Sequence, residues 1–185
     1  PAILEWPARI KRPRTSEVLG GTVDIYPTLL ELAGATVPGQ PPLDGISLVP
    51  LIDGKMEHRD APLGFWAYPV RGIGTPSEKL LEQLMAVQQG DAEPDEQRPP
   101  DNDARRYPAD SLPGHAAWNN GRYKLHRVAD KDGKNARYEL YDLNADTAEQ
   151  HDMAERQPVH LERMKAELAA WQQSVLRSLN GADYR

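Results

Sequence analysis

The chain has 185 residues, of which 39% are hydrophobic and 27% charged, and its formal net charge is −6. This length suits one domain of ordinary size, or one and a half small ones. The negative charge argues against a nucleic-acid partner, because the phosphate backbone repels an acidic protein. Cysteine is absent, which excludes disulfides, thiolate metal ligands and a cysteine nucleophile. No stretch approaches the roughly 18 apolar residues of a membrane span.

A short apolar run opens the chain. Ala2–Trp6 lies between two prolines and predicts a strand buried on both faces. Such a strand needs neighbours on both edges, and this chain offers no obvious parallel partners for it. We therefore interpret residues 1–60 as the tail of a larger α/β domain. Because the chain does not begin with methionine, we expect a piece of a longer protein or a processed product.

Two short helices are expected between Thr22 and Gly54. Asp24 can cap the first helix, and Pro27 fits in a first turn, where no intrahelical bond is lost. Ser47 is expected to cap the second helix. Each helix meets a glycine at its end, where a positive φ is accepted. The apolar residues recur at helical spacing: Ile25, Leu29, Leu32 and Ala33 in the first helix, then Leu48, Leu51 and Ile52 in the second.

Residues 61–90 predict a strand followed by a helix. The aromatic run ending at Val70 is typical of a strand, with a bend or edge at Pro69. Thr75, Pro76 and Glu78 form a capping box, and the apolar stripe that follows it is Leu80, Leu81, Leu84, Met85 and Val87. Residues 91–114 are rich in Asp, Glu, Arg and Pro, and we expect a long variable surface loop.

The remaining sequence predicts three more strands and a long helix. Asn120-Gly121 is typical of a tight turn between two strands within residues 115–128, and Arg137–Leu143 alternates as a third. Pro158–Asn180 predicts a helix whose stripe is Leu161, Met164, Leu168, Trp171, Val175 and Leu179. The expected fold class of residues 61–185 is therefore α+β: a small antiparallel sheet of about four strands packed by a long C-terminal helix.

Four ordered segments resemble the sulfatase family, the formylglycine-dependent hydrolases of sulfate esters. They read PAILEWPARI, DIYPTLLELAG, LDGISLVPLIDG and YELYDLNADTAEQHDMA. The resemblance implies the C-terminal portion of an arylsulfatase-like protein, with residues 1–60 at the edge of an alkaline-phosphatase-like α/β domain. It also implies an upstream catalytic domain as partner, a sulfated small molecule or glycan as substrate, and a periplasmic or secreted location. Formylglycine and calcium, or another divalent metal, would belong to that upstream domain.

The family's catalytic apparatus has no counterpart in this sequence. The nucleophile is made from the first residue of C/S-x-P-x-R, and no serine here has proline and arginine at those offsets. The paired-aspartate motif of the metal site is also missing. We assign no catalytic or metal-binding residue, and the chain alone is predicted to be inactive.

Three residues are candidates for contact with a substrate. His115 follows the variable loop and opens a strand, where a rigid sheet could hold it. Trp66 could stack on a sugar ring, and Arg71 could hold a sulfate or carboxylate. The alternatives are a surface histidine at a strand end and a tryptophan in the core. The basic cluster Arg9, Lys11, Arg12 and Arg14 is interpreted as a solvated loop.

Two other functions remain open. Phosphonate or phosphate monoester hydrolases of the same superfamily have similar C-terminal segments, and only the upstream nucleophile and metal ligands would separate them from sulfatases. The second alternative is a non-catalytic binding module, in which Trp66, Trp118 and the variable loop bind a protein or a glycan.

Overall fold

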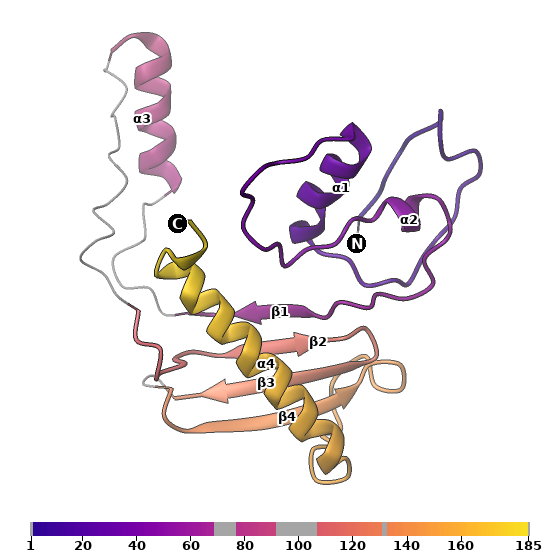
Figure 1. Cartoon of the computed structure of the whole chain (residues 1–185), viewed down its shortest axis with the longest axis vertical. Helices are drawn as coiled ribbons and strands as arrows, with labels where there is room; N and C mark the ends of the chain where they lie inside the picture. Colours follow the sequence, from indigo (N-terminus) through magenta and orange to yellow (C-terminus); the bar gives the residue numbers. More distant parts are fainter. Residues whose placement is uncertain (1, 69–76, 92–106, 131–132, 185) are drawn as a thin grey trace.

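A computed structural model describes residues 2–68, 77–91, 107–130 and 133–184. Its centre is a four-stranded antiparallel sheet in the order β1-β2-β3-β4. The long helix α4 crosses one face of this sheet, while α1 and α2 lie beyond its β1 edge (Figure 1). The elements are η1 (Thr22–Asp24), α1 (Ile25–Ala33), α2 (Val49–Ile52), β1 (Leu63–Trp66), α3 (Ser77–Gln89), β2 (Ala116–Asn119), β3 (Tyr123–Ala129), β4 (Ala136–Asp142), α4 (Pro158–Leu179) and η3 (Ala182–Tyr184).

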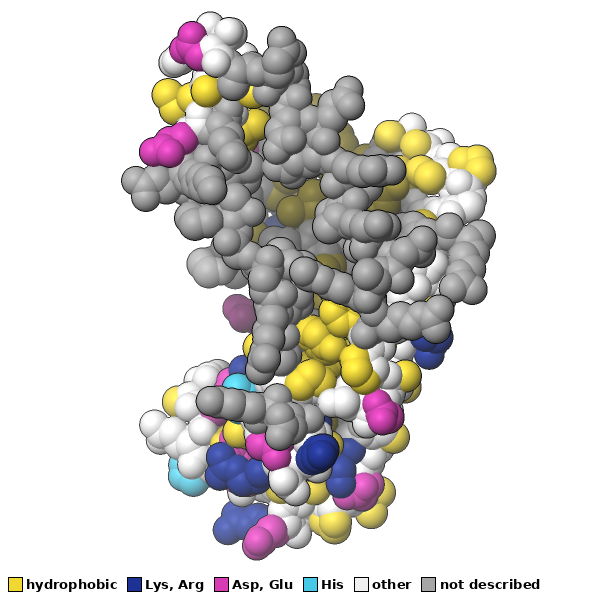
Figure 2. All heavy atoms as spheres, turned by 90° about the vertical axis from the view of Figure 1, so that its left-hand side faces the viewer, with side chains coloured by type: hydrophobic (Ala, Val, Ile, Leu, Met, Phe, Trp, Pro, Cys, Tyr) yellow, Lys and Arg dark blue, Asp and Glu magenta, His cyan; other side chains and the backbone are white. Residues whose placement is uncertain are grey.

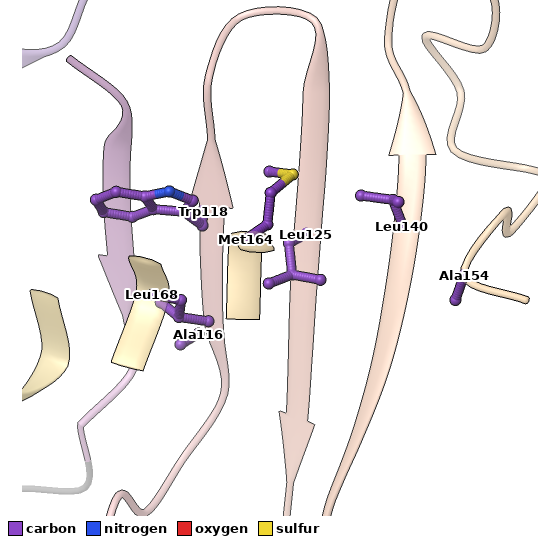
Figure 3. Close-up of a cluster of buried hydrophobic side chains, with 7 residues drawn as sticks. All are labelled: Ala116, Trp118, Leu125, Leu140, Ala154, Met164 and Leu168. Atoms are coloured by element: carbon purple, nitrogen blue, oxygen red, sulfur yellow. The ribbon is translucent and has the colours of Figure 1, made fainter. Parts of the chain in front are cut away.

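The sheet and its covering helix confirm the predicted α+β architecture. Each strand pairs with the next in sequence, so the whole sheet is built from neighbouring antiparallel strands. Two-residue alternation places Leu125 and Leu140 on the face under α4, and both are fully buried. They form the core with Ala116, Trp118, Ala154, Met164 and Leu168 (Figure 3).

The β2–β3 turn differs from the prediction by one residue. The pairing of Asn119 with Lys124 leaves Gly121 and Arg122 as the two central residues, in place of Asn120 and Gly121. Gly121 has φ 95°, which matches a type II′ turn, where glycine occupies the first central position. The Asn120 side chain instead accepts a hydrogen bond from the backbone N–H of Tyr123 at 2.8 Å. Asn120 therefore braces the turn and does not adopt a positive φ.

Helix α4 buries a different set of residues from the predicted stripe in its C-terminal half. Met164 and Leu168 are buried as expected, but the next buried residues are Gln172 and Leu176. Leu179, the last member of the predicted stripe, is 41% exposed. Steps of four residues overshoot a helical turn by about 40°. The buried line therefore winds around α4 as the helix crosses the sheet.

The segment around α1 is organised by a buried carboxylate. Asp24 precedes α1, but its side chain does not cap the helix. Its oxygens accept hydrogen bonds from the backbone N–H groups of Gly21 and Ile46 and from the Arg59 guanidinium, each at 2.8 Å. At Gly45, a Cβ atom would lie 2.0 Å from the carbonyl oxygen of Val23, so only glycine fits this close approach. Asp24 thus joins three segments that are distant in sequence.

Two details of α2 and the N-terminus differ from expectation. The hydroxyl of Ser47 does accept a bond from the Val49 N–H at 3.2 Å, but the N-cap position itself is Leu48. Ala2–Trp6 is not a strand, and Ile3 is 99% exposed. A strand requires hydrogen-bonding partners along its edges, and no described segment of this chain pairs with it.

Helix α3 confirms the predicted helix but projects away from the sheet (Figure 1). Three residues of its apolar stripe, Leu81, Leu84 and Met85, are exposed. At the top of Figure 2, where α3 lies, hydrophobic side chains are exposed beside acidic ones. The predicted capping residues Thr75 and Pro76 lie outside the described residues, as do Pro69 and Val70. Gly90 ends the helix with φ 78°.

Candidate functional site

Trp66 lies at the last position of β1, on the sheet face that α4 covers. It pairs with Ala116 of β2, and it is half-buried. Its indole N–H donates to the carbonyl oxygen of Pro113 at 2.7 Å. Pro113 belongs to the end of the variable loop, so Trp66 ties this loop to the sheet. Trp66, which was predicted to stack on a substrate, therefore has a structural role in the fold.

An aromatic cluster extends from Trp66 toward the loop. The ring of Tyr68 meets Trp66 edge-on with 4.9 Å between centroids, and Tyr107 meets Tyr68 at 5.6 Å. Partial burial raises the pKa of the Tyr68 hydroxyl, and the neighbouring Tyr107 adds to this effect. The ring centroid of Trp171 of α4 lies 6.5 Å from that of Trp66. These four rings offer apolar faces of the kind that sugars stack on.

His115 immediately precedes β2 and is exposed. Its backbone carbonyl accepts a hydrogen bond from the Ala67 N–H at 2.8 Å, which extends the pairing of β1 with β2. Its Nδ1 accepts from the Ala129 N–H at 3.2 Å. His115 and Trp66 therefore lie at the same end of the sheet, but their side chains make separate contacts. Arg71, the third candidate, lies outside the described residues.

Arg127 fixes the end of the variable loop and was not singled out from the sequence. Its side chain is buried in the sheet, and Nη1 donates to the carbonyl oxygens of Leu112 and Gly114 at 2.6 and 3.1 Å. Nη2 donates to the carbonyl of Gly133 at 3.1 Å. At Gly133, a Cβ atom would lie 2.5 Å from Leu112 backbone atoms. The alternation of β3 places Arg127 on an apolar face, and that mismatch is the one sequence signal for its role.

A polar cluster occupies the opposite face of the sheet. Glu149 accepts a bond from the Lys124 ammonium at 2.7 Å, and its second oxygen lies 2.6 Å from Nε2 of His126. The Lys124 bond, followed by that of His126, lowers the pKa of Glu149. Glu149 has φ 55°, the only positive φ among described residues other than glycine. Each charge here has a partner, as in a structural network that holds the loop after β4 to the sheet.

The described residues contain no group of three or more His, Asp or Glu side chains placed to hold a metal ion. No helix within the described ranges is long and apolar enough to cross a membrane. The geometry thus offers aromatic and polar side chains for contact with a ligand. It assigns no residue of the described part to bond cleavage.

Comparison with known proteins returns sulfatases. Steryl-sulfatase of Homo sapiens is 38% identical over 60 residues, which cover 32% of this chain and 10% of that protein. N-acetylgalactosamine-6-sulfatase of Canis lupus familiaris is 40% identical over 60 residues, 32% of this chain and 12% of that protein. Arylsulfatase A of Bos taurus is 41% identical over 76 residues, 40% of this chain and 15% of that protein. The matches thus span a small fraction of each relative.

Two of the solved structures returned by the comparison have TM-scores below 0.5. One, a protein in complex with its substrate D-glucosamine-2-N,6-O-disulfate, has a TM-score of 0.45 at 16% identity, covering 88% of this chain and 25% of its own. The phosphonate monoester hydrolase of Agrobacterium radiobacter has a TM-score of 0.38 at 22% identity, covering 86% of this chain and 24% of its own. No family model matches the chain. The curated relatives nevertheless confirm the resemblance to the sulfatase family, over 32% to 40% of this chain.

Proposed function

We propose that this chain is the C-terminal part of a sulfatase that hydrolyses sulfate esters. The observation that carries the proposal is the 38% to 41% identity to three proteins named as sulfatases. In this proposal, residues 1–60 form the tail of the large α/β domain, and residues 61–185 form an α+β subdomain. The nucleophile and the divalent metal, calcium in the family, belong to the preceding part of the protein.

The exposed apolar residues of α1 support a partner domain. Ile25 and Leu29 are one helical turn apart, and both are more than half exposed, at 56% and 57%. Ile3 and Leu4, in the segment that was predicted as a buried strand, are exposed as well. A helix usually turns its apolar side to a neighbouring element. We infer that the preceding α/β domain of the same polypeptide covers these residues.

In the complete protein, residues 61–185 would shape the substrate pocket. Trp66, His115 and Arg71 are the proposed contacts, with a sulfated small molecule or glycan as substrate. Tyr107 joins them because it belongs to the same aromatic cluster as Trp66. Since Arg127 fixes residues 112–114, it would position the loop that precedes His115.

The experiment is to express the complete open reading frame and to assay an aryl sulfate beside a phosphonate monoester. The proposal predicts a C/S-x-P-x-R motif upstream and metal-dependent turnover of the sulfate ester. Preferred turnover of the phosphonate would favour the alternative function, that of a phosphonate monoester hydrolase. A reading frame that starts near Pro1 would instead favour the binding module.

A further inference from the structure

The N-terminal segment and the end of α2 border an open pocket on the surface of the protein. Its volume is about 490 Å³, within the range of about 300 to 1,000 Å³ that is usual for small-molecule sites. Its charged lining residues are Arg9, Lys11, Arg12, Arg14, Asp53 and Lys55. It is formed entirely by residues 9–14 and 52–55, and none of the proposed substrate contacts belongs to it.

Two arginines fix the walls of this pocket. Arg9 binds both carboxylate oxygens of Asp53, through Nε at 2.7 Å and Nη2 at 2.9 Å. Arg14 donates from Nη2 to the carbonyl oxygen of Leu51 at 2.6 Å and also to that of Ile52. These carbonyls belong to the last turn of α2, where backbone acceptors have few helical partners, and that of Leu51 also accepts the Gly54 N–H at 3.0 Å. The segment carrying the basic cluster is an exposed loop, as predicted, and Arg9 and Arg14 anchor it to the end of α2.

Gly54 makes room for this anchoring. It has φ 73°, and a Cβ atom on it would lie 2.6 Å from Nη1 of Arg14. Any other residue would push the Arg14 guanidinium away from the α2 carbonyls. The pocket is thus held by a bidentate ion pair on one side and by an arginine clamp on the other.

The charge of the pocket is strongly positive. Five cationic side chains line it against one carboxylate, in a chain whose formal net charge is −6. Asp53 is already bound by Arg9, and this bond lowers the pKa of its carboxyl group. In the part of the chain that the structure describes, the side chains of Arg12 and Lys55 make no ion pair or hydrogen bond, and the Lys11 ammonium donates only to the Pro7 carbonyl. Three cations therefore remain available to a ligand.

We propose that this pocket binds a sulfate or phosphate group through Lys11, Arg12 and Lys55. A tetrahedral oxyanion presents several acceptor oxygens, and arginine and lysine are the side chains that bind it best. The cations surround one pocket and do not follow a helix or strand, so they suit a compact anionic group better than a nucleic-acid backbone. The group can be a free ion or an ester on a saccharide. This proposal rests on the pocket alone and not on the proposed catalytic function.

The test is a binding titration of the 185-residue chain at constant ionic strength. Sodium sulfate or phosphate replaces chloride, and backbone amide NMR shifts of residues 9–14 and 53–55 report occupancy. A sulfated glucosamine disaccharide and its desulfated form are titrated in parallel. The proposal predicts saturable shifts in this pocket with sulfate or phosphate, and none with the desulfated sugar. Tighter binding of the sulfated sugar than of the free ion would assign the site to an ester group; the reverse would assign it to the ion.

Matched variants distinguish anion binding in this pocket from a general effect of the protein's charge. Arg12→Gln and Lys55→Gln should each weaken binding by about three- to tenfold, because each removes one cation that the anion contacts. The controls Arg177→Gln and Lys134→Gln remove exposed charges outside the pocket and should change affinity less than twofold. Thermal melts of all four variants check folding. Absence of saturable binding, equal weakening by the controls, or equal affinity for chloride or duplex DNA would overturn the proposal.

Discussion

The Asp24–Arg59 pair is the most deeply buried ion pair among the described residues. The two side chains are 0% and 1% exposed, and their oxygen and nitrogen atoms are 2.8 Å apart. Asp24 also accepts the two backbone bonds described above, and Nε of Arg59 donates to the carbonyl of Ala61. Removing one charge of a buried pair leaves the other without compensation.

Asp24→Ala should therefore lower the free energy of unfolding by about 3–5 kcal/mol, as measured by urea denaturation. The control is Asp60→Ala, whose carboxylate is 92% exposed beside His58. This control should change stability by less than about 0.5 kcal/mol. Equal effects of the two substitutions would show that the buried pair does not organise the segment around α1.

A substitution at Gly64 tests how closely β1 packs against α4. A Cβ atom on Gly64 would lie 2.5 Å from the ring of Trp171. Gly64→Ala should therefore destabilise the fold by about 1–3 kcal/mol through overpacking. Trp171→Ala alone should cost about 3–5 kcal/mol, because a large aromatic side chain is lost from the interface.

The double variant distinguishes a direct contact from two independent losses. With the ring gone, the added methyl group meets no obstacle, so the two costs should be clearly less than additive in denaturant melts. Additive costs would mean that α4 does not lie on β1 at this point.

At the scale of elements, the polar cluster on the outer sheet face links β3 to the loop after β4. Glu149 faces Lys124 and His126, and the ring of His126 meets Tyr141 edge-on at 5.8 Å. The folded-state pKa of Glu149 is lowered, so its contribution to stability is complete above the unfolded pKa and is lost as pH falls through the folded pKa.

The stability difference between the wild type and Glu149→Gln should therefore be largest near neutral pH and shrink in the acid range. Urea melts across the pH range measure it. Glu155→Gln, at an exposed glutamate, is the control and should change stability little. A constant difference for Glu149→Gln would mean that its ionised form is not what holds the loop.

Local chemistry predicted the elements that are stabilised by neighbours in sequence. The β2–β3 hairpin and α4 could be predicted because alternation, turn glycine and helical spacing are local signals. The turn centre was displaced because Asn120 bonds across the turn, which only the strand register reveals. Gln172 has a fully buried side chain whose amide atoms find no partner in the described part. Because glutamine is polar, Gln172 was not included in the predicted apolar stripe.

The candidate site was harder to predict because its contacts join distant residues. Trp66 and His115 could be proposed from residue type, but the bond from Trp66 to Pro113 spans 47 positions. Arg127 is a charged residue on a buried face, and its three carbonyl partners come from two separate loops. The strand predicted at Ala2–Trp6 failed because a strand depends on partners outside its own sequence.

At the scale of the whole molecule, the exposed apolar face of α1 tests the proposed preceding domain. Ile25→Ser together with Leu29→Ser should change the unfolding free energy of the 185-residue chain by less than about 1 kcal/mol, because both side chains are already exposed. In the complete protein, the same substitutions should cost about 2 kcal/mol or more, since they would remove buried apolar area. Equal effects in both proteins would contradict docking through this face.

The decisive measurement for the proposed sulfatase origin is the turnover of an aryl sulfate by the 185-residue chain. The chain is assayed with and without added calcium, beside the complete protein as a positive control. Under the proposal that the nucleophile and the metal ligands lie in a preceding domain, no hydrolysis above the protein-free background is expected. Measurable metal-dependent hydrolysis by this chain would contradict it.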